Sequence, residues 1–148
     1  MIEDRLANIH ARAMVIPKGW RADELRDVLN GPGVFLVLPD ERAPSSESKI
    51  DGFALGRVVL DEAELLTLAV APDAQGRGLG RKTLAAFEAR AALKGAASAF
   101  LEVAVANQPA RRLYMTTGWA EVGHRRGYYS VNGERHDALA MRKSLTGA

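Results

Sequence analysis

The stretch that decides the fold reads VAPDAQGRGLGRKTL, from Val70 to Leu84. An apolar run precedes it and a run with helical periodicity follows it, so three alternate glycines lie between a strand and a helix. Successive backbone N–H groups at such a junction, together with a helix N-terminus, can bind a phosphate-like anion. The stretch therefore predicts either a phosphate-binding loop or a glycine-rich turn without a ligand.

Two common phosphate-binding patterns do not fit these glycines. The dinucleotide pattern G-x-G-x-x-G, begun at Gly76, requires a third glycine where Arg81 stands. The P-loop pattern requires a glycine directly before Lys82–Thr83, and Arg81 occupies that position too. The pattern that remains is Q-x-x-G-x-G, from Gln75 to Gly80.

The periodicity on both sides of this stretch predicts an α/β fold in one domain, residues 1–148. Helices are expected at Glu3–Met14, Ala22–Leu29, Leu79–Leu93 and Gln108–Thr117, and strands at Val34–Leu38, Ile50–Leu60, Ala63–Val70, Ser98–Val105, Trp119–Val131 and His136–Lys143. The polar segment Pro39–Lys49 is expected to be a flexible loop, and Asp61–Glu62 a turn. This order of elements predicts a mixed central sheet flanked by helices.

The composition is that of a globular protein. Of 148 residues, 47% are apolar and 26% charged, which argues against disorder. No apolar run approaches the roughly 20 residues of a membrane-spanning helix, and the N-terminus lacks a signal-peptide pattern. The chain has no cysteine, and its three histidines lack metal-ligand spacing, so we expect no metal site. These features predict a cytoplasmic protein without a membrane partner.

Charge divides the chain into two halves. Residues 1–66 hold 8 Lys/Arg and 12 Asp/Glu, whereas residues 67–148 hold 12 and 6. The basic half suits an anionic ligand such as a nucleotide or coenzyme, and the lack of a dense basic tract disfavours nucleic acid as a direct partner. In the acidic half, Asp23, Glu24 and Asp27 are candidates to attract a basic peptide.

A second motif follows about thirty residues downstream. The stretch LEVAVANQPARRLYMTTGW, Leu101–Trp119, contains N-x-x-A-x-x-L-Y-x-x-x-G-[FW] from Asn107 onward. Together with the glycine stretch it resembles the GNAT (GCN5-related) N-acetyltransferases. The resemblance implies the GNAT fold, apparently without its first strand, and acetyl-CoA as cosubstrate, with its pyrophosphate on Gln75–Gly80. The coenzyme-binding residues it implies are Leu68, Val70, Gln75, Gly76, Arg77, Gly78, Leu79, Gly80, Asn107 and Ala110.

Acetyl transfer to an amine has two proton requirements. An α-amino group, with a pKa of about 7.7–8.0, must lose a proton to attack, and the departing thiolate needs one. Glu102, in an apolar strand, is a candidate base acting through water, and Tyr114 a candidate acid. The residues alone leave open a solvent-facing Glu102 and a Tyr114 that only packs against the sheet.

Between Val58 and Met141 the chain resembles one subfamily more specifically, namely the bacterial ribosomal-protein-alanine N-acetyltransferases of the RimI type. It implies Glu102 as base, Tyr114 as acid, and the N-terminal alanine of a small-subunit ribosomal protein as acceptor, attacked directly without an acyl-enzyme. Candidate walls of the acceptor pocket are Trp20, Tyr128 and Tyr129, each with a purely structural alternative. The alternative functions are acetylation of a small amine (an aminoglycoside or polyamine) and non-catalytic sensing of acyl-CoA. We expect a monomer or a weak homodimer.

Overall fold

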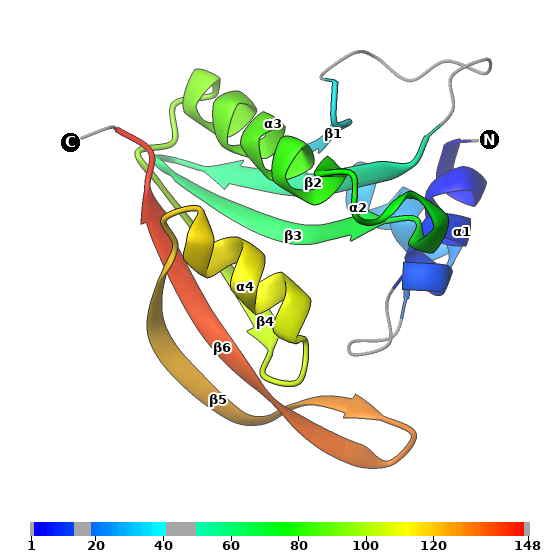
Figure 1. Ribbon diagram of the computed structural model, residues 1–148. Helices are drawn as coiled ribbons and strands as arrows, with labels where there is room; N and C mark the ends of the chain where they lie inside the picture. Colours follow the sequence, from blue (N-terminus) through cyan, green and yellow to red (C-terminus); the bar gives the residue numbers. More distant parts are fainter. Residues whose placement is uncertain (1, 14–18, 41–49, 147–148) are drawn as a thin grey trace.

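The computed structural model describes residues 2–13, 19–40 and 50–146 (Figure 1). Its elements are α1 Ile2–Ala13, α2 Ala22–Leu29, β1 Val34–Val37, β2 Gly52–Val59, β3 Glu62–Val70, the short 3-10 helix η1 Pro72–Ala74, α3 Leu79–Leu93, β4 Ser98–Ala104, α4 Gln108–Thr116, β5 Ala120–Val131 and β6 Glu134–Ser144. Most of the predicted loop Pro39–Lys49 lies outside the described residues, as does Met14. Within the described ranges, no helix is both long and apolar enough to cross a lipid bilayer.

The strands form one mixed sheet in the order β1-β2-β3-β4-β6-β5, which confirms the predicted fold class. All neighbours are antiparallel except β3 and β4, which α3 connects as a crossover. This parallel pair is short, because Glu62–Glu64 pairs with Ser98–Phe100 and the pairing ends there. Figure 1 shows the two strands diverging beyond this point, with α4 beside the opening. The divergence leaves a wedge in the middle of the sheet.

A β-bulge in β3 decides which side chains face which layer. Leu55 pairs with Thr67 and the next residue, Gly56, pairs with Leu65, so Leu66 is an extra residue in β3. Bulges change the direction of the side chains that follow them. Leu65 accordingly packs in the core under α3 and α4, whereas Thr67 lies on the side of α1 and hydrogen-bonds to it.

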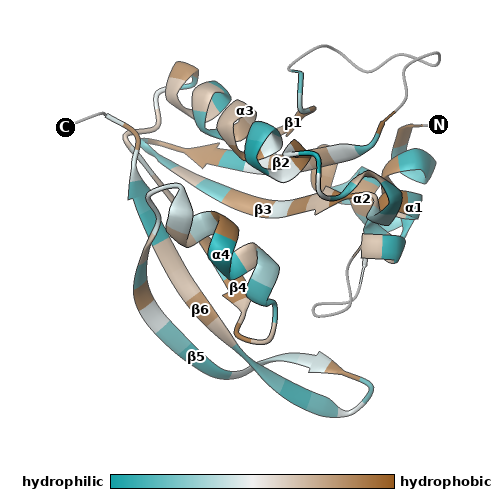
Figure 2. Ribbon diagram, viewed as in Figure 1, coloured by the Kyte–Doolittle hydropathy of each residue, from teal (hydrophilic) through white to brown (hydrophobic). Residues whose placement is uncertain are grey.

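Each face of the sheet has its own hydrophobic core. One core, under α3 and α4, includes Leu84 and Phe87; the other, under α1 and α2, includes Leu6, Leu25 and Phe53. Figure 2 shows apolar and polar residues alternating along the central strands, whereas β5 is mainly hydrophilic. Because β5 is an edge strand and mostly exposed, its polar surface is what an edge requires.

One local prediction needs correction, and a second gains a detail. The β2–β3 hairpin turns at Leu60–Asp61, one residue before the expected Asp61–Glu62, and Leu60 adopts a left-handed φ of 57°. The predicted strand Trp119–Val131 is confirmed as β5, but its pairing with β6 shifts register, because Arg125 pairs with Ala138 and the next pair recorded on β5 is formed by Tyr129. Residues 126–128 therefore bulge out of β5, a feature that alternating polarity does not reveal.

Candidate active site

A groove of about 540 Å³ runs from the end of β3 along the glycine loop to α4, and we call it the donor groove. It is lined by Ala13, Leu68, Val70, Gln75, Gly76, Gly78, Leu79, Gly80, Arg81, Asn107, Pro109, Ala110, Leu113 and Tyr114. Every residue predicted to contact the coenzyme lies here except Arg77, which is exposed outside the lining. The two sequence motifs thus form opposite walls of one groove.

The three glycines of the loop have two different roles. Gly76 and Gly78 adopt φ values of 84° and 75°, which L side chains rarely adopt, although added Cβ atoms would meet nothing within 4 Å. Gly80 lies in the first turn of α3, where an added Cβ would lie 3.4 Å from Leu113 of α4. The first two glycines therefore set the backbone path, whereas a Cβ at position 80 would make only an ordinary van der Waals contact with α4.

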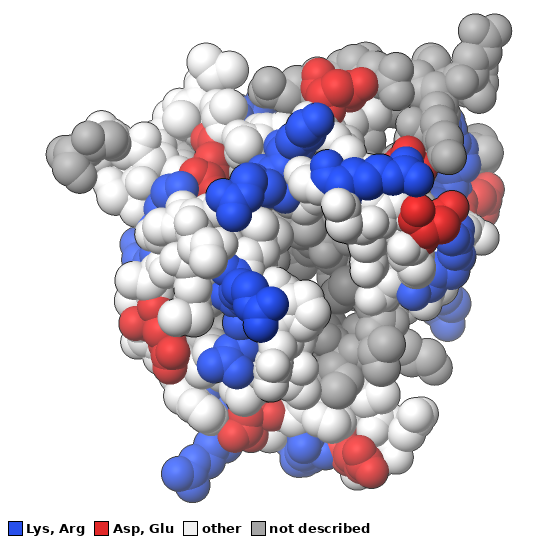
Figure 3. Space-filling view, in the orientation of Figure 1, with Lys and Arg blue, Asp and Glu red and all other residues white. Residues whose placement is uncertain are grey.

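The loop presents backbone N–H groups at the start of α3. Gly78 is the N-cap residue of this helix and supplies no capping side chain. An anion is stabilised at such a helix start by N–H groups and by the helix dipole. Arg77, Arg81 and Lys82 are exposed nearby. Figure 3 shows Lys and Arg side chains gathered over this face, around a hollow.

Side chains fix both ends of the groove. The Gln75 amide donates a hydrogen bond to the Val70 carbonyl oxygen at 3.1 Å, which ties the loop back to β3. On the other wall, Asn107 Oδ1 accepts a hydrogen bond from the Ala110 N–H at 3.3 Å and caps α4. Asn107 is therefore both the N-cap of α4 and a lining residue of the groove.

A second cavity, which we call the acceptor pocket, adjoins the donor groove inside the wedge between β3 and β4. Its lining residues are His10, Trp20, Leu65, Leu66, Thr67, Leu68, Leu101, Glu102, Val103, Ala104, Asn107, Ala110, Tyr114 and Tyr129. Four of these, Leu68, Asn107, Ala110 and Tyr114, also line the donor groove. Ligands in the two cavities would meet at these shared residues.

Glu102 extends from β4 into the acceptor pocket, and its side chain is only 18% exposed. Its Oε2 lies 3.2 Å from Nε of Arg125, an ion pair that lacks the alignment of a hydrogen bond. Among the described residues, this buried oxygen has no hydrogen-bond partner. The carboxylate is therefore held near a cation while one oxygen retains the capacity to accept a hydrogen bond from a ligand or water.

Tyr114 is buried where the two cavities join, with its ring centroid 6.0 Å from that of Trp119. Burial, and secondarily the neighbouring Tyr129, raises the pKa of the Tyr114 phenol well above its ordinary value. Burial, with the charge of Glu102 and the neighbouring Tyr128, also raises the pKa of Tyr129 to about 12. Both phenols are therefore protonated near neutral pH and can donate hydrogen bonds into the cavities.

The bulge in β5 brings aromatic side chains to the pocket. Asp137 of β6 accepts a hydrogen bond from the Gly127 N–H at 2.8 Å and lies 2.8 Å from Nε2 of His124. The hydrogen bond with His124, and then the one with Gly127, lowers the pKa of Asp137. These two contacts of Asp137 fix the bulge, and Tyr129 beside it lines the pocket. Tyr128 lies outside the pocket lining, is 47% exposed and packs edge-on against Tyr129.

A buried histidine, His10, connects two segments that line the acceptor pocket. Nδ1 of His10 lies 2.6 Å from the Trp20 backbone N–H, and Nε2 lies 2.7 Å from Oγ1 of Thr67. The rings of His10 and Trp20 lie against each other at a tilt of 33°, with centroids 5.1 Å apart. Sequence reasoning placed Trp20 at the acceptor side but missed His10 and Thr67. The available signals were a histidine on the apolar stripe of α1 and a lone threonine in an apolar strand.

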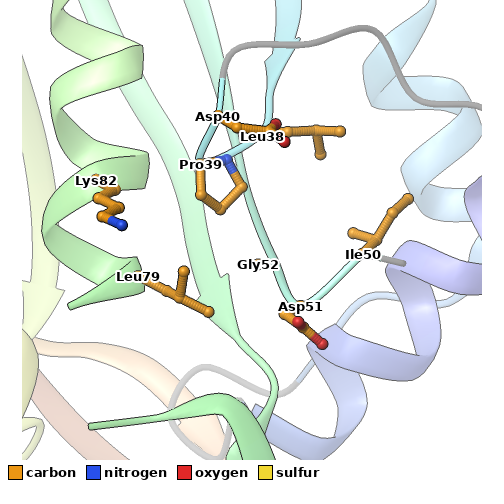
Figure 4. Close-up of a pocket in the computed structure, with 8 residues that line it drawn as sticks. All are labelled: Leu38, Pro39, Asp40, Ile50, Asp51, Gly52, Leu79 and Lys82. Carbon is orange, nitrogen blue, oxygen red and sulfur yellow. The ribbon is translucent and has the colours of Figure 1, made fainter. Parts of the chain in front are cut away.

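A third cavity, of about 340 Å³, lies between the end of β1, the start of β2 and α3 (Figure 4). Leu38, Gly52 and Lys82 are among its lining residues. Neither Glu102 nor Tyr114 lines it, and it shares only Leu79 with the donor groove. It therefore does not bring together the groups that acetyl transfer requires.

The fold, with its divergent parallel strands and glycine loop, defines a class of protein. The profile of the Acetyltransferase (GNAT) family matches residues 4–119, and the chain belongs to this family. Within it, the chain is 40% identical over 97 residues to the [ribosomal protein bS18]-alanine N-acetyltransferase of Escherichia coli strain K12, an alignment that covers 66% of each protein. In sequence, the chain thus matches just under two thirds of that relative's length.

Solved structures agree with this assignment. The crystal structure of the ribosomal-protein-S18-alanine N-acetyltransferase from Escherichia coli superimposes with a TM-score of 0.82 at 31% identity, covering 99% of this chain and 89% of that one. Arabidopsis thaliana NAA60, solved in complex with acetyl-CoA, gives a TM-score of 0.80 at 20% identity, covering 98% and 94%. The similarity to NAA60, at 20% identity, shows a common fold and nothing more. Both the GNAT resemblance and its narrower RimI-type form are confirmed.

Proposed function

We propose that this protein transfers an acetyl group from acetyl-CoA to the N-terminal α-amino group of a protein, namely the N-terminal alanine of a small-subunit ribosomal protein. The observation that carries the proposal is the junction of the two cavities, with Tyr114 shared and Glu102 in the acceptor pocket. The names of the relatives supply the acceptor. We place this reaction in the cytoplasm, and we propose that it proceeds without a metal ion.

The donor groove suits the coenzyme. Its pyrophosphate would lie against the N–H groups that follow Gly76 and Gly78, with Arg81 at the rim. Beyond Glu64, β3 is no longer paired with β4, so its backbone edge is available to the extended pantetheine arm. Binding along a strand edge would direct the thioester toward Leu68 and Tyr114, where the cavities meet.

The chemistry requires one proton acceptor and one proton donor. Glu102, directly or through a water, takes a proton from the acceptor ammonium group, whose amine then attacks the thioester carbon. The new C–N bond forms, the C–S bond breaks, and Tyr114 supplies a proton or hydrogen bond to the departing thiolate. The phenol of Tyr114 is protonated near neutral pH, as this role requires, and its raised pKa makes a hydrogen bond to the thiolate its main contribution. The second proton that the nitrogen loses passes to solvent water as the tetrahedral intermediate collapses, and Tyr114 regains from solvent any proton that it gave to the thiolate.

An acceptor screen tests the proposal. Purified protein is incubated with acetyl-CoA and one acceptor at a time: a peptide that begins with alanine, the same peptide with a blocked N-terminus, an aminoglycoside and a polyamine. We expect turnover only with the free alanine peptide. Turnover only with a small amine would replace the proposed acceptor class, and coenzyme binding without turnover on any acceptor would favour a sensor.

A further inference from the structure

Both ring nitrogens of His10 are engaged in hydrogen bonds, and the proposed acetyl-transfer mechanism gives this residue no part. It is 1% exposed, and its two ring nitrogens contact groups on two different segments, Trp20 before α2 and Thr67 on β3. Because the Trp20 backbone N–H can only donate, Nδ1 must accept, and the proton of the neutral ring therefore resides on Nε2. Burial also lowers the pKa of His10 to about 4, so the neutral ring predominates near neutral pH.

This tautomer determines how the Thr67 hydroxyl is used. Nε2–H donates to Oγ1 of Thr67, so the hydroxyl proton must point to another acceptor. Among the described residues, the contact with His10 is the one hydrogen bond recorded for this hydroxyl. Thr67 is 8% exposed and lines the acceptor pocket, so its proton is available to a ligand there.

The same histidine fixes the position of the Trp20 wall. Gly19 packs so closely on α1 that an added Cβ would lie 2.8 Å from the backbone of His10 and Ala11. The hydrogen bond from the Trp20 backbone N–H to Nδ1 and the contact between the two rings complete the attachment. Through His10, one wall of the pocket is thus tied to the strand that carries Thr67.

We infer that His10 is a positioning residue of the acceptor site: it holds the Trp20 wall through Nδ1 and, through Nε2–H, turns the Thr67 hydroxyl proton toward the acceptor. A peptide acceptor offers a suitable partner in the carbonyl oxygen of its first residue. The inference rests on the proposed function, because it assigns the pocket to an acceptor amine. It makes Thr67 a specificity-determining donor.

Substitutions can separate the two nitrogens of His10. His10→Asn places an amide oxygen near the position of Nδ1, whereas His10→Gln places an amide nitrogen near that of Nε2. Thr67→Val removes the hydroxyl at nearly constant shape, and Thr67→Ser retains it. Steady-state kinetics with the best acceptor from the screen, together with acetyl-CoA binding by calorimetry, gives KM for the acceptor separately from coenzyme affinity.

We expect Thr67→Val to raise KM for the peptide about fivefold, Thr67→Ser to restore it, and coenzyme affinity to stay unchanged. His10→Asn should raise the acceptor KM as Thr67→Val does, and adding Thr67→Val to it should cause little further change. The matched control is Thr83→Val in α3, a fully buried threonine whose hydroxyl donates to the Leu79 carbonyl oxygen. It should leave both constants unchanged.

The outcomes separate this inference from the proposed function. An unchanged acceptor KM in Thr67→Val, or an equal loss of coenzyme affinity, would overturn the positioning role even if the alanine peptide is the substrate. If the screen instead selects a small amine without a carbonyl group, the proposed acceptor is wrong. In that case the carbonyl partner is wrong as well, and only His10→Gln, which loosens the Trp20 wall, should raise the acceptor KM.

Discussion

The donor groove and the acceptor pocket adjoin one another but are built differently. Most residues that line the donor groove come from two continuous stretches, Gln75–Arg81 and Asn107–Tyr114, and the others are Ala13, Leu68 and Val70. The acceptor pocket is made of side chains from five places: α1, the segment before α2, β3, β4 and β5, joined by residues of α4. The first depends on a few φ angles, and the second depends on contacts between distant segments.

This difference predicts how each region responds to substitution. In the donor groove, only residues that change the backbone path should matter strongly, because N–H groups do not depend on the side chain. In the acceptor pocket, single side chains such as Glu102 and His10 carry a charge or hold a wall. Changes there should affect the acceptor and the chemical step while leaving coenzyme binding intact.

The largest effect is expected for the candidate proton-transfer residues. Glu102→Gln should lower kcat about a hundredfold or more, and Tyr114→Phe by a smaller factor, because each removes one proton-transfer group. Coenzyme affinity, measured by calorimetry, should change less than about twofold in both, since binding relies on backbone groups. Wild-type turnover in both variants would refute the roles assigned to these residues.

The next effect concerns stability and involves His10. The pKa of His10 is 6.5 in the unfolded chain and about 4 in the folded protein. Between these two pH values the unfolded state binds a proton that the folded state does not bind. Stability should therefore fall as pH decreases from 6.5 toward 4. Between about pH 7.5 and pH 5 this amounts to about 2 kcal/mol.

Urea denaturation of wild type and His10→Gln at both pH values measures this contribution. Other groups titrate in both proteins, so the informative quantity is the difference between them. Wild type should lose about 2 kcal/mol more than the variant on acidification. Equal losses would mean that the pKa of His10 is the same in the folded and the unfolded protein, so that its protonation costs no stability.

A smaller effect distinguishes the glycines of the donor groove. Gly78→Ala must adopt a left-handed φ and should raise KM for acetyl-CoA about tenfold, without changing KM for the acceptor. Gly80→Ala, whose Cβ would meet Leu113 at 3.4 Å, is the matched control and should change KM for acetyl-CoA less than about threefold. If the order of the two variants were reversed, helix approach rather than loop conformation would limit coenzyme binding.

The smallest effect is expected from the acidic charges near α2. Asp23 and Glu24 lie 3.2 and 3.5 Å from Nε of Arg21, which offsets part of their charge, so attraction of a basic peptide rests mainly on Asp27. Replacing Asp23 and Asp27 with asparagine and Glu24 with glutamine should raise KM for a basic peptide about twofold at low salt and leave it unchanged at high salt. A KM that stays constant at low salt would exclude electrostatic attraction by this helix.

The residues predicted to bind the coenzyme, apart from Arg77, line one groove, and their grouping could be predicted because it is local in sequence. Gly76, Gly78 and the Asn107 cap act through the backbone of their own segments, and motif spacing reports such roles directly. The helix and strand order followed from periodicity for the same reason. The turn at Leu60–Asp61 was predicted one residue too late, and the bulge at 126–128 within β5 was not foreseen. A left-handed leucine and a hydrogen bond from Gly127 to Asp137 leave no periodic signal.

The acceptor side could be predicted only in part. Glu102, Tyr114, Trp20 and Tyr129 were expected from motifs, and they line one pocket. The contact of His10 with Thr67, 57 residues away, depends on a bulge at Leu66 that turns Thr67 toward α1. Contacts of this kind require the register of the strands, which spacing along a single sequence does not contain.

The central claim is that donor and acceptor occupy adjoining sites at the same time and react directly. Initial rates measured over a grid of acetyl-CoA and alanine-peptide concentrations test it most directly. The account predicts double-reciprocal lines that intersect, as a ternary complex requires. Parallel lines, together with an acetylated protein isolated when acetyl-CoA is supplied alone, would contradict it by revealing a covalent acetyl-enzyme.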